Sequence, residues 1–160
     1  KEHLLNEVFR GTQRWATGVV KAVDADRTLK APERLARIAR RFVETARRDP
    51  AGARMLLRQR DGKFLDPPSR DAAREFREAV QQIVAAGKAD GMVRAGPAEL
   101  WTSVWLVILA FVIERVSARE WTMDQPQVAQ AIEAAWSAIA APAPAAPGRM
   151  SAPEGPAAEG

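Results

Sequence analysis

One segment constrains the fold of this 160-residue chain more than any other. Residues 104–113 read Val-Trp-Leu-Val-Ile-Leu-Ala-Phe-Val-Ile, an unbroken apolar run. Successive residues of a helix are about 100° apart, so a run of this length covers every side of a helix, and every side must then be shielded from water. Crossing a bilayer takes about 20 apolar residues, so the run is too short to span a membrane. It predicts a helix that is covered on all sides by protein.

A domain of this size can shield only one broad side of such a helix, and in a soluble protein the usual partner for the other side is a second copy. We therefore expect an all-α fold of six helices, in which the last two long helices of each copy form an intermolecular four-helix bundle. A monomer in which five helices wrap the central one is the alternative. The residues expected at the dimer interface lie on these two helices: Ile108, Phe111, Val112, Ala131, Ala135, Trp136 and Ile139.

The rest of the apolar pattern has the 3.6-residue period of amphipathic helices, and no stretch favours a strand. The first helix is expected from Lys1 to about Val23, and its apolar stripe is in phase from the first residue, which suggests that the natural protein begins upstream. Prolines suit a first turn, Ser and Asp cap helices, and glycine ends them. After the first helix, helix starts are expected at Pro32, at Asp49 with Pro50, and at Ser69, and a helix end is expected at Gly87. A further helix is expected from Pro97 to about Arg119, and the last one follows the capping-box pair Thr122 and Gln125.

Composition divides the chain into two parts. Residues 1–141 carry the periodic pattern and are expected to form one helical domain. Residues 142–160 are mostly Pro, Ala and Gly and cannot bury enough apolar surface to offset the entropy lost on ordering, so we expect a disordered tail. The chain has no cysteine and does not open with a secretory signal, which favours a cytoplasmic protein that does not enter membranes.

The patterns of common catalytic and metal sites are missing. One histidine, His3, and no tyrosine or cysteine leave few groups for acid–base, nucleophilic or metal chemistry. Gly87 and Lys88 resemble the end of a phosphate-binding loop, but Gln82 stands where that motif requires glycine. The carboxylates lie at helical spacing from arginines, which is typical of solvated faces. We therefore expect no enzymatic activity, metal or cofactor; an enzyme that uses carboxylates is the alternative.

The net charge of +4 is a mild excess, because 24 basic residues are interleaved with 20 acidic ones. It permits weak attraction to phosphates without requiring it. The second helix concentrates this charge and could contact phosphate, although a solvated face is the simpler interpretation. Its arginines are Arg34, Arg37, Arg40, Arg41, Arg47 and Arg48.

Large apolar side chains recur in phase with the stripes of several helices, and large aromatic residues often line ligand cavities. If these helices pack side by side, their side chains converge on one space that suits a largely hydrophobic ligand. One polar group of the ligand could then meet Gln59, Thr102 or Ser103. Plain core packing is the alternative. The predicted ligand-binding residues are Trp15, Phe42, Met55, Gln59, Phe76, Trp101, Thr102 and Trp105.

Two segments and the order of the helices resemble a known family. Residues 1–5, Lys-Glu-His-Leu-Leu, followed by Val8 and Phe9, are similar to the start of the fourth helix of TetR-type transcriptional regulators. Residues 87–93, Gly-Lys-Ala-Asp-Gly-Met-Val, followed by Pro97 and a long apolar helix, resemble the junction before the eighth helix of that family. The resemblance covers residues 1 to about 141.

The resemblance implies helices four to nine of that family, with a ligand between the middle helices and dimerisation through the last two. The family's first three helices, including the recognition helix, are missing from the chain, so operator DNA would be bound only through that absent head. The expected function is therefore effector sensing and dimerisation in a regulator that represses transcription. The expected partners are a second copy and a small hydrophobic effector. A stand-alone helical protein–protein interaction module without a ligand is the alternative.

Overall fold

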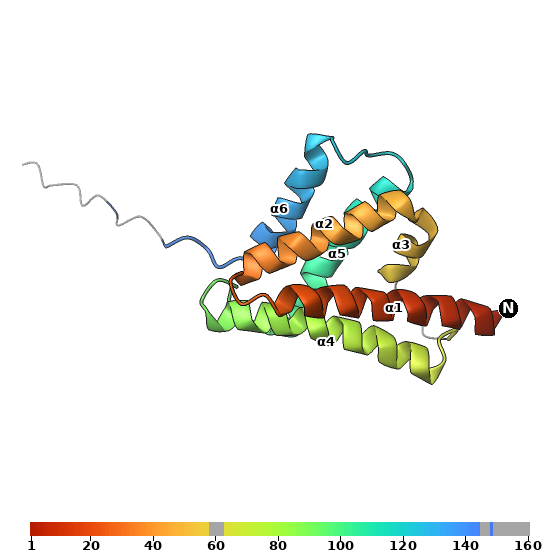
Figure 1. Cartoon of the computed structure of the whole chain (residues 1–160). Coiled ribbons are helices and arrows are strands. Elements are labelled where there is room, and N and C mark those ends of the chain that lie inside the picture. The colour runs from red at the N-terminus through yellow and green to blue at the C-terminus, as the bar shows by residue number, and fades with distance from the viewer. Residues whose placement is uncertain (58–62, 145–147, 149–160) are drawn as a thin grey trace, which may run out of the picture.

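The computed structural model describes residues 1–57, 63–144 and 148, and within them the chain is all-helical (Figure 1). The predicted fold class is confirmed: these residues form six helices and one isolated bridge, with no strand. The helices are α1 (Glu2–Asp24), α2 (Ala31–Arg48), α3 (Pro50–Leu56), α4 (Pro67–Ala89), α5 (Ala98–Ser117) and α6 (Pro126–Ile139). The expected tail, residues 142–160, lies largely outside the described part.

Helix α2 occupies the centre of the domain and packs against every other helix. Leu35, Ile38 and Phe42 on α2 are completely buried. Helices α1 and α4 lie side by side below α2 and begin at the same end of the molecule, while α5 passes behind α2 and pairs with α6 (Figure 1). The helix enclosed by the others is thus the amphipathic α2 and not the apolar α5.

Helix α5 has one buried side and one exposed side despite its uniform composition. Trp105, Leu109 and Val112 face the core, whereas Val107 and Phe111 are 62% and 45% exposed. By length and composition α5 could cross a membrane, but core helices of soluble proteins pass the same test, and α5 packs against α2, α3, α4 and α6. The alternative arrangement, in which the five other helices wrap α5 on all sides, is therefore wrong.

Both predicted ends of α4 are wrong, for reasons that lie in its contacts. Asp66, and not Ser69, caps its start: the carboxylate accepts a hydrogen bond of 2.9 Å from the Ser69 amide. The helix continues past Gly87 to Ala89, and Gly91 provides the left-handed conformation with φ +74°. Gly87 is buried where α4 approaches the start of α2.

The C-terminal end of α6 is tied to the connection between α4 and α5. The Arg94 amide donates to the Ile139 carbonyl at 2.9 Å, and the Ala141 amide donates to the Met92 carbonyl at 2.8 Å. At the other end, the predicted capping-box pair forms the turn before α6, since the Thr122 amide donates to Gln125 Oε1 at 2.9 Å. The helix itself begins at Pro126.

Candidate functional site

The predicted ligand-binding residues do not converge on one cavity. Trp15, Phe42 and Phe76 form a row across α1, α2 and α4, with ring centroids 5.7 Å and 5.9 Å apart. Phe42 and Trp105 are among the largest fully buried side chains. In this row and at Trp105 the aromatic rings pack into the core, and only the two ends of the row border open space.

Trp101 and Thr102 have local partners at the start of α5. The indole of Trp101 donates to the Ala95 carbonyl at 3.1 Å, and the Arg94 guanidinium lies 4.9 Å from its ring centroid. The Thr102 hydroxyl donates to the Ala98 carbonyl at 2.8 Å. These bonds secure the turn and the first helical turn of α5.

Two predicted residues remain. Met55 is half-buried on α3. Gln59 lies outside the described residues.

A hollow of about 480 Å³ opens between α1, α3, α4 and α5, and we call it the α4/α5 groove. Phe76 lines it, as does Ser103, which the sequence suggested as a polar contact. Apolar side chains make up most of its wall. Its lining residues are Phe9, Gln13, Leu56, Leu57, Leu65, Ala73, Phe76, Arg77, Ser103, Leu106, Val107 and Ala110.

Three polar side chains interrupt this apolar wall. Gln13 is buried, and its Nε2 donates to the Leu56 carbonyl at 2.9 Å. Arg77 Nη2 donates to Ser103 Oγ at 2.5 Å, and that hydroxyl donates to the Glu99 carbonyl at 3.0 Å. The Arg77–Ser103 bond joins α4 to α5 across the groove.

Sequence analysis missed most of the groove, including Gln13 and Arg77. One signal was present for Arg77: it follows Ala73 by four residues and Phe76 by one, which places it at the edge of the apolar stripe of α4. Only its position on the stripe distinguishes it from the solvated arginines of the same helix.

A second hollow of about 400 Å³ lies between α1, α2 and α3, at the Trp15 end of the aromatic row. Trp15 is partly exposed there. The hydroxyls of Thr12 and Thr45 point to the carbonyls of their own helices, at 3.0 Å and 2.9 Å. The polar side chains of this hollow are therefore largely engaged, which makes it a poorer site for a ligand with a polar group.

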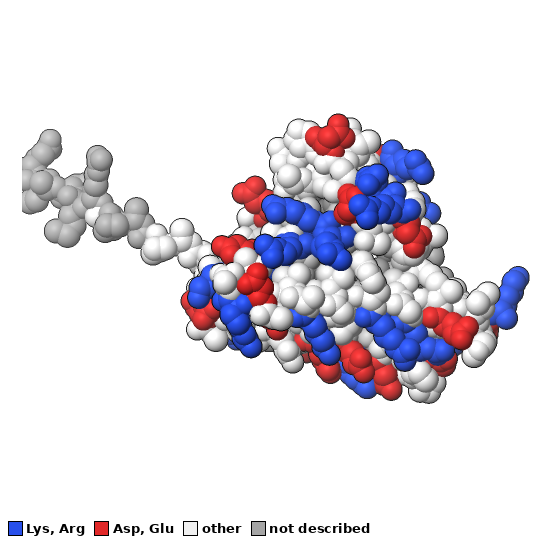
Figure 2. All heavy atoms as spheres, viewed as in Figure 1, with Lys and Arg blue, Asp and Glu red and all other residues white. Residues whose placement is uncertain are grey.

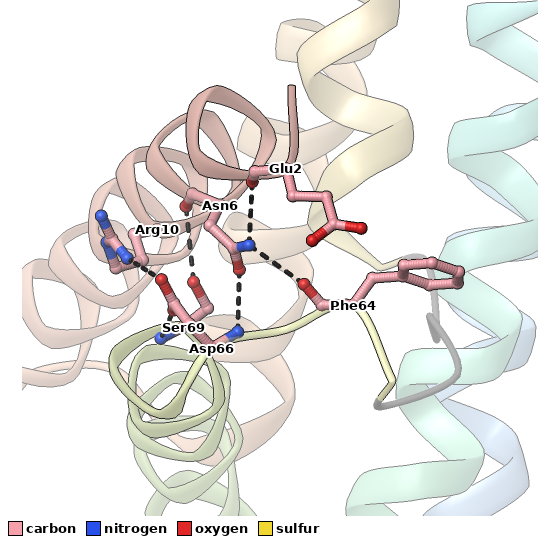
Figure 3. A network of polar contacts seen from close by, with 6 residues as sticks. All are labelled: Glu2, Asn6, Arg10, Phe64, Asp66 and Ser69. Atoms are coloured by element: carbon pink, nitrogen blue, oxygen red, sulfur yellow. Dashed lines mark hydrogen bonds and ion pairs between the residues drawn. The ribbon is translucent and has the colours of Figure 1, made fainter.

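A polar network beside the α4/α5 groove joins the start of α1 to the start of α4 (Figure 3). The buried Asn6 accepts from the Asp66 amide and donates to the Phe64 carbonyl, both at 3.0 Å. Arg10 forms an ion pair of 2.7 Å with Asp66. The Ser69 side chain and amide, together with the Arg10 guanidinium, hold the pKa of Asp66 below its usual value, against partial desolvation.

The outer side of α5 is the candidate dimer face. Leu100, Val107 and Phe111 are exposed on it, and Ile108 is half-buried. The Phe111 ring lies edge-on to Trp121 with centroids 5.5 Å apart. This face adjoins the α4/α5 groove, because Val107 belongs to both.

The other predicted interface residues divide into two groups. Ala131 and Trp136 on α6 are half-buried and keep accessible surface. Val112, Ala135 and Ile139 are buried inside the subunit and offer no side-chain surface to a second copy. All three face the core of the subunit: the apolar run of α5 does not reveal which side of that helix receives α6, and Ala135 and Ile139 lie on the side of α6 that joins the core.

The exposed arginines of α2 form a basic band on one face of the molecule (Figure 2), whereas Arg34 is buried and pairs with Asp24 at 3.0 Å. Arg37 pairs with Asp26 at 3.6 Å, and Glu44 pairs with Arg47 and Arg48 at 2.7 Å and 3.2 Å. Such exposed, partly neutralised pairs fit a solvated helix face.

Among the described residues, no three His, Asp or Glu side chains gather in a way that could hold a metal ion. No curated protein matches the chain. A family model described as the tetracyclin repressor-like, C-terminal domain matches residues 17–141, which is most of the chain. That match begins within α1, after the groove residues Phe9 and Gln13, and spans α2 to α6. The chain therefore belongs to the family of tetracyclin repressor-like C-terminal domains.

Proposed function

We propose that this chain is the effector-sensing and dimerisation domain of a TetR-type transcriptional repressor in the cytoplasm. A small hydrophobic effector occupies the α4/α5 groove, a second copy covers the outer side of α5, and a separate N-terminal head binds operator DNA. The protein performs no catalysis in this role. The observation that carries the proposal is that one helix, α5, forms both a wall of the groove and the exposed apolar face.

The size and lining of the groove support a small apolar ligand. Ligand sites typically enclose about 300–1,000 Å³ and combine apolar walls with a few polar groups. The groove of about 480 Å³ falls in that range and draws its wall from four helices. Phe9, Phe76 and Leu106 supply apolar area, and each Å² removed from water contributes about 0.025 kcal/mol before the costs of association are subtracted.

Because α5 belongs to both the groove and the dimer face, a bound effector could change the geometry of the dimer. Ala110 and Val107 line the groove, and Phe111, the residue next to Ala110, lies on the exposed face. A ligand that displaces α5 would shift the surface presented to the second copy. Effector binding and dimer geometry would then be coupled through one helix, and by linkage dimer formation would change the affinity for the effector by the same factor.

The assembly is tested by placing a charge on the exposed face. Phe111→Glu should convert a dimer to a monomer in sedimentation equilibrium, because a carboxylate between two copies of α5 would lose its water, and the nearby Arg115, 5.1 Å from the Phe111 ring centroid, is already paired with Glu120. Val8→Glu is the matched control, since Val8 is an apolar residue of similar exposure, 47%, on α1. Ala135 is unsuitable because its burial inside the subunit would confuse unfolding with dissociation. A wild-type chain that sediments as a monomer would refute the dimer.

The ligand site is tested by filling the groove. The neutral fluorescent probe N-phenyl-1-naphthylamine should bind the wild-type protein with enhanced emission. Ala73→Phe should abolish that binding, because Ala73 lines the groove, whereas Ala85→Phe on the exposed side of α4 should not. Equal binding of the probe by the wild type and by Ala73→Phe would show that the groove is not the effector site. A dimer that binds no probe would instead favour the protein–protein interaction module.

A further inference from the structure

We infer that the effector of the α4/α5 groove is an apolar molecule with a carboxylate, and that Arg77 binds that carboxylate. The inference rests on the proposed function, because it assigns a chemical class to the ligand of the same groove.

The charge of the groove is its most specific feature. Among the described lining residues Arg77 is the one charged side chain, and the other polar ones are Gln13 and Ser103. None of the ion pairs in the described part of the chain includes Arg77. Within those residues, the groove therefore presents a positive charge that no carboxylate of the protein neutralises.

The neighbouring arginine on the same helix shows the contrast. Arg74, less than one turn earlier, is exposed and pairs with Asp71 at 2.6 Å and with Glu78 at 4.0 Å. Arg77 is half-buried, and its guanidinium donates to the neutral hydroxyl of Ser103. Burying a cation away from water is costly unless an anion accompanies it, so an anionic ligand would relieve a cost that is built into the groove.

The donors of Arg77 suit a carboxylate. A guanidinium carries five N–H donors in a planar fork, and carboxylates accept two of them in parallel. The bond to Ser103 uses one donor of Nη2 and fixes the guanidinium beside the apolar wall. The body of the ligand would then pack against Phe9, Phe76 and Leu106. An ammonium group would be repelled at this position, and a neutral molecule would leave the charge unmatched.

The experiment compares ligands that share one body. Decanoate, decanol and decylammonium, each below its aggregation concentration, are titrated calorimetrically into the full chain. Decanoate should bind roughly tenfold or more tightly than decanol, and decylammonium should bind most weakly, because charge-assisted hydrogen bonds contribute about 1.5–3 kcal/mol. Biphenyl-4-carboxylate distinguishes an aryl acid from an alkyl acid, and tight binding of either acid supports the inference.

Variants assign the preference to the arginine. Arg77→Met should reduce decanoate binding by about tenfold and change decanol binding by less than about threefold. Arg74→Met is the matched control and should change neither. Arg77→Lys keeps the charge without the fork and should retain part of the preference for decanoate, which guards against misfolding of the methionine variant.

The outcomes separate the inference from the proposed function. Decanol that binds as tightly as decanoate, or a preference for decylammonium, would overturn the carboxylate while leaving the groove as the effector site. Unchanged decanoate binding by a folded Arg77→Met variant would also overturn it. Failure of the neutral probe and of all three decyl compounds to bind would instead refute the proposed effector site.

Discussion

Replacing Gly87 by alanine should destabilise the domain, although alanine normally strengthens a helix. A Cβ atom at Gly87 would lie 2.7 Å from the Cβ of Ala31 and 3.0 Å from Cγ2 of Val93. Ordinary contacts of this kind lie at 3.4–4 Å, so α4 and the start of α2 would have to separate by roughly an ångström. Gly18, by contrast, lies on α1 with nothing within 4 Å of such an atom, so Gly18→Ala is the matched control.

The magnitude follows from two opposed effects. Alanine gains about 0.8–1 kcal/mol over glycine inside a helix, and this gain applies at both positions. Overpacking a close contact costs about 1–3 kcal/mol, and this cost applies at Gly87 alone. The free energy of unfolding should therefore rise by almost 1 kcal/mol in Gly18→Ala and fall by up to about 2 kcal/mol in Gly87→Ala.

Urea denaturation followed by circular dichroism measures both values on the same protein. The difference between the two variants isolates the contact between α4 and α2, because the helix-propensity gain cancels. Thermal unfolding should show the same order, with a separation of several degrees for a domain of this size. A Gly87→Ala protein as stable as Gly18→Ala would show that the helices do not approach closely there, and the argument from the glycine would fail.

Two further predictions concern the network that joins α1 to α4. Asn6→Ala should cost about 1–3 kcal/mol of stability, measured by urea denaturation, because the Asp66 amide and the Phe64 carbonyl lose their buried partner; a variant as stable as the wild type would contradict this. Asp66 has a lowered pKa, so its stabilisation is present above its unfolded value of 3.8 and is lost as the pH falls through the lower folded value. Between about pH 5 and pH 2, Asp66→Asn, which keeps a capping side chain, should lose less stability than the wild type, and parallel pH profiles would refute the role of this carboxylate.

Local sequence patterns determined the secondary structure. The 3.6-residue period located α1, α2, α4 and α6, because a surface helix must alternate between water and core at that spacing. Prolines and Asp49 marked real starts, since the capping bond from the Gly52 amide to Asp49 is local. The ends of α4 were predicted less well, because Gly87 lies in close contact with Ala31 and Val93 inside the helix and does not end it.

Uniformly apolar segments hold no information about direction. Because residues 104–113 are apolar on every side, the pattern predicted burial without revealing which side of α5 meets the core and which stays exposed. Val112 was assigned to the interface and lies inside the subunit, while Val107 lies on the exposed side. The packing of α2 and α6 decides this orientation.

The sequence by itself determined six helices, a large apolar core and the resemblance to the TetR-type family, because each depends on composition and spacing along one chain. The tertiary structure alone decided which large side chains fill space and which border it. Phe42 and Phe76 are alike in sequence, yet Phe42 is sealed among the helices and Phe76 reaches a groove. It also set Arg77 apart from Arg74, because the surroundings of a charge depend on helices that are distant in the sequence.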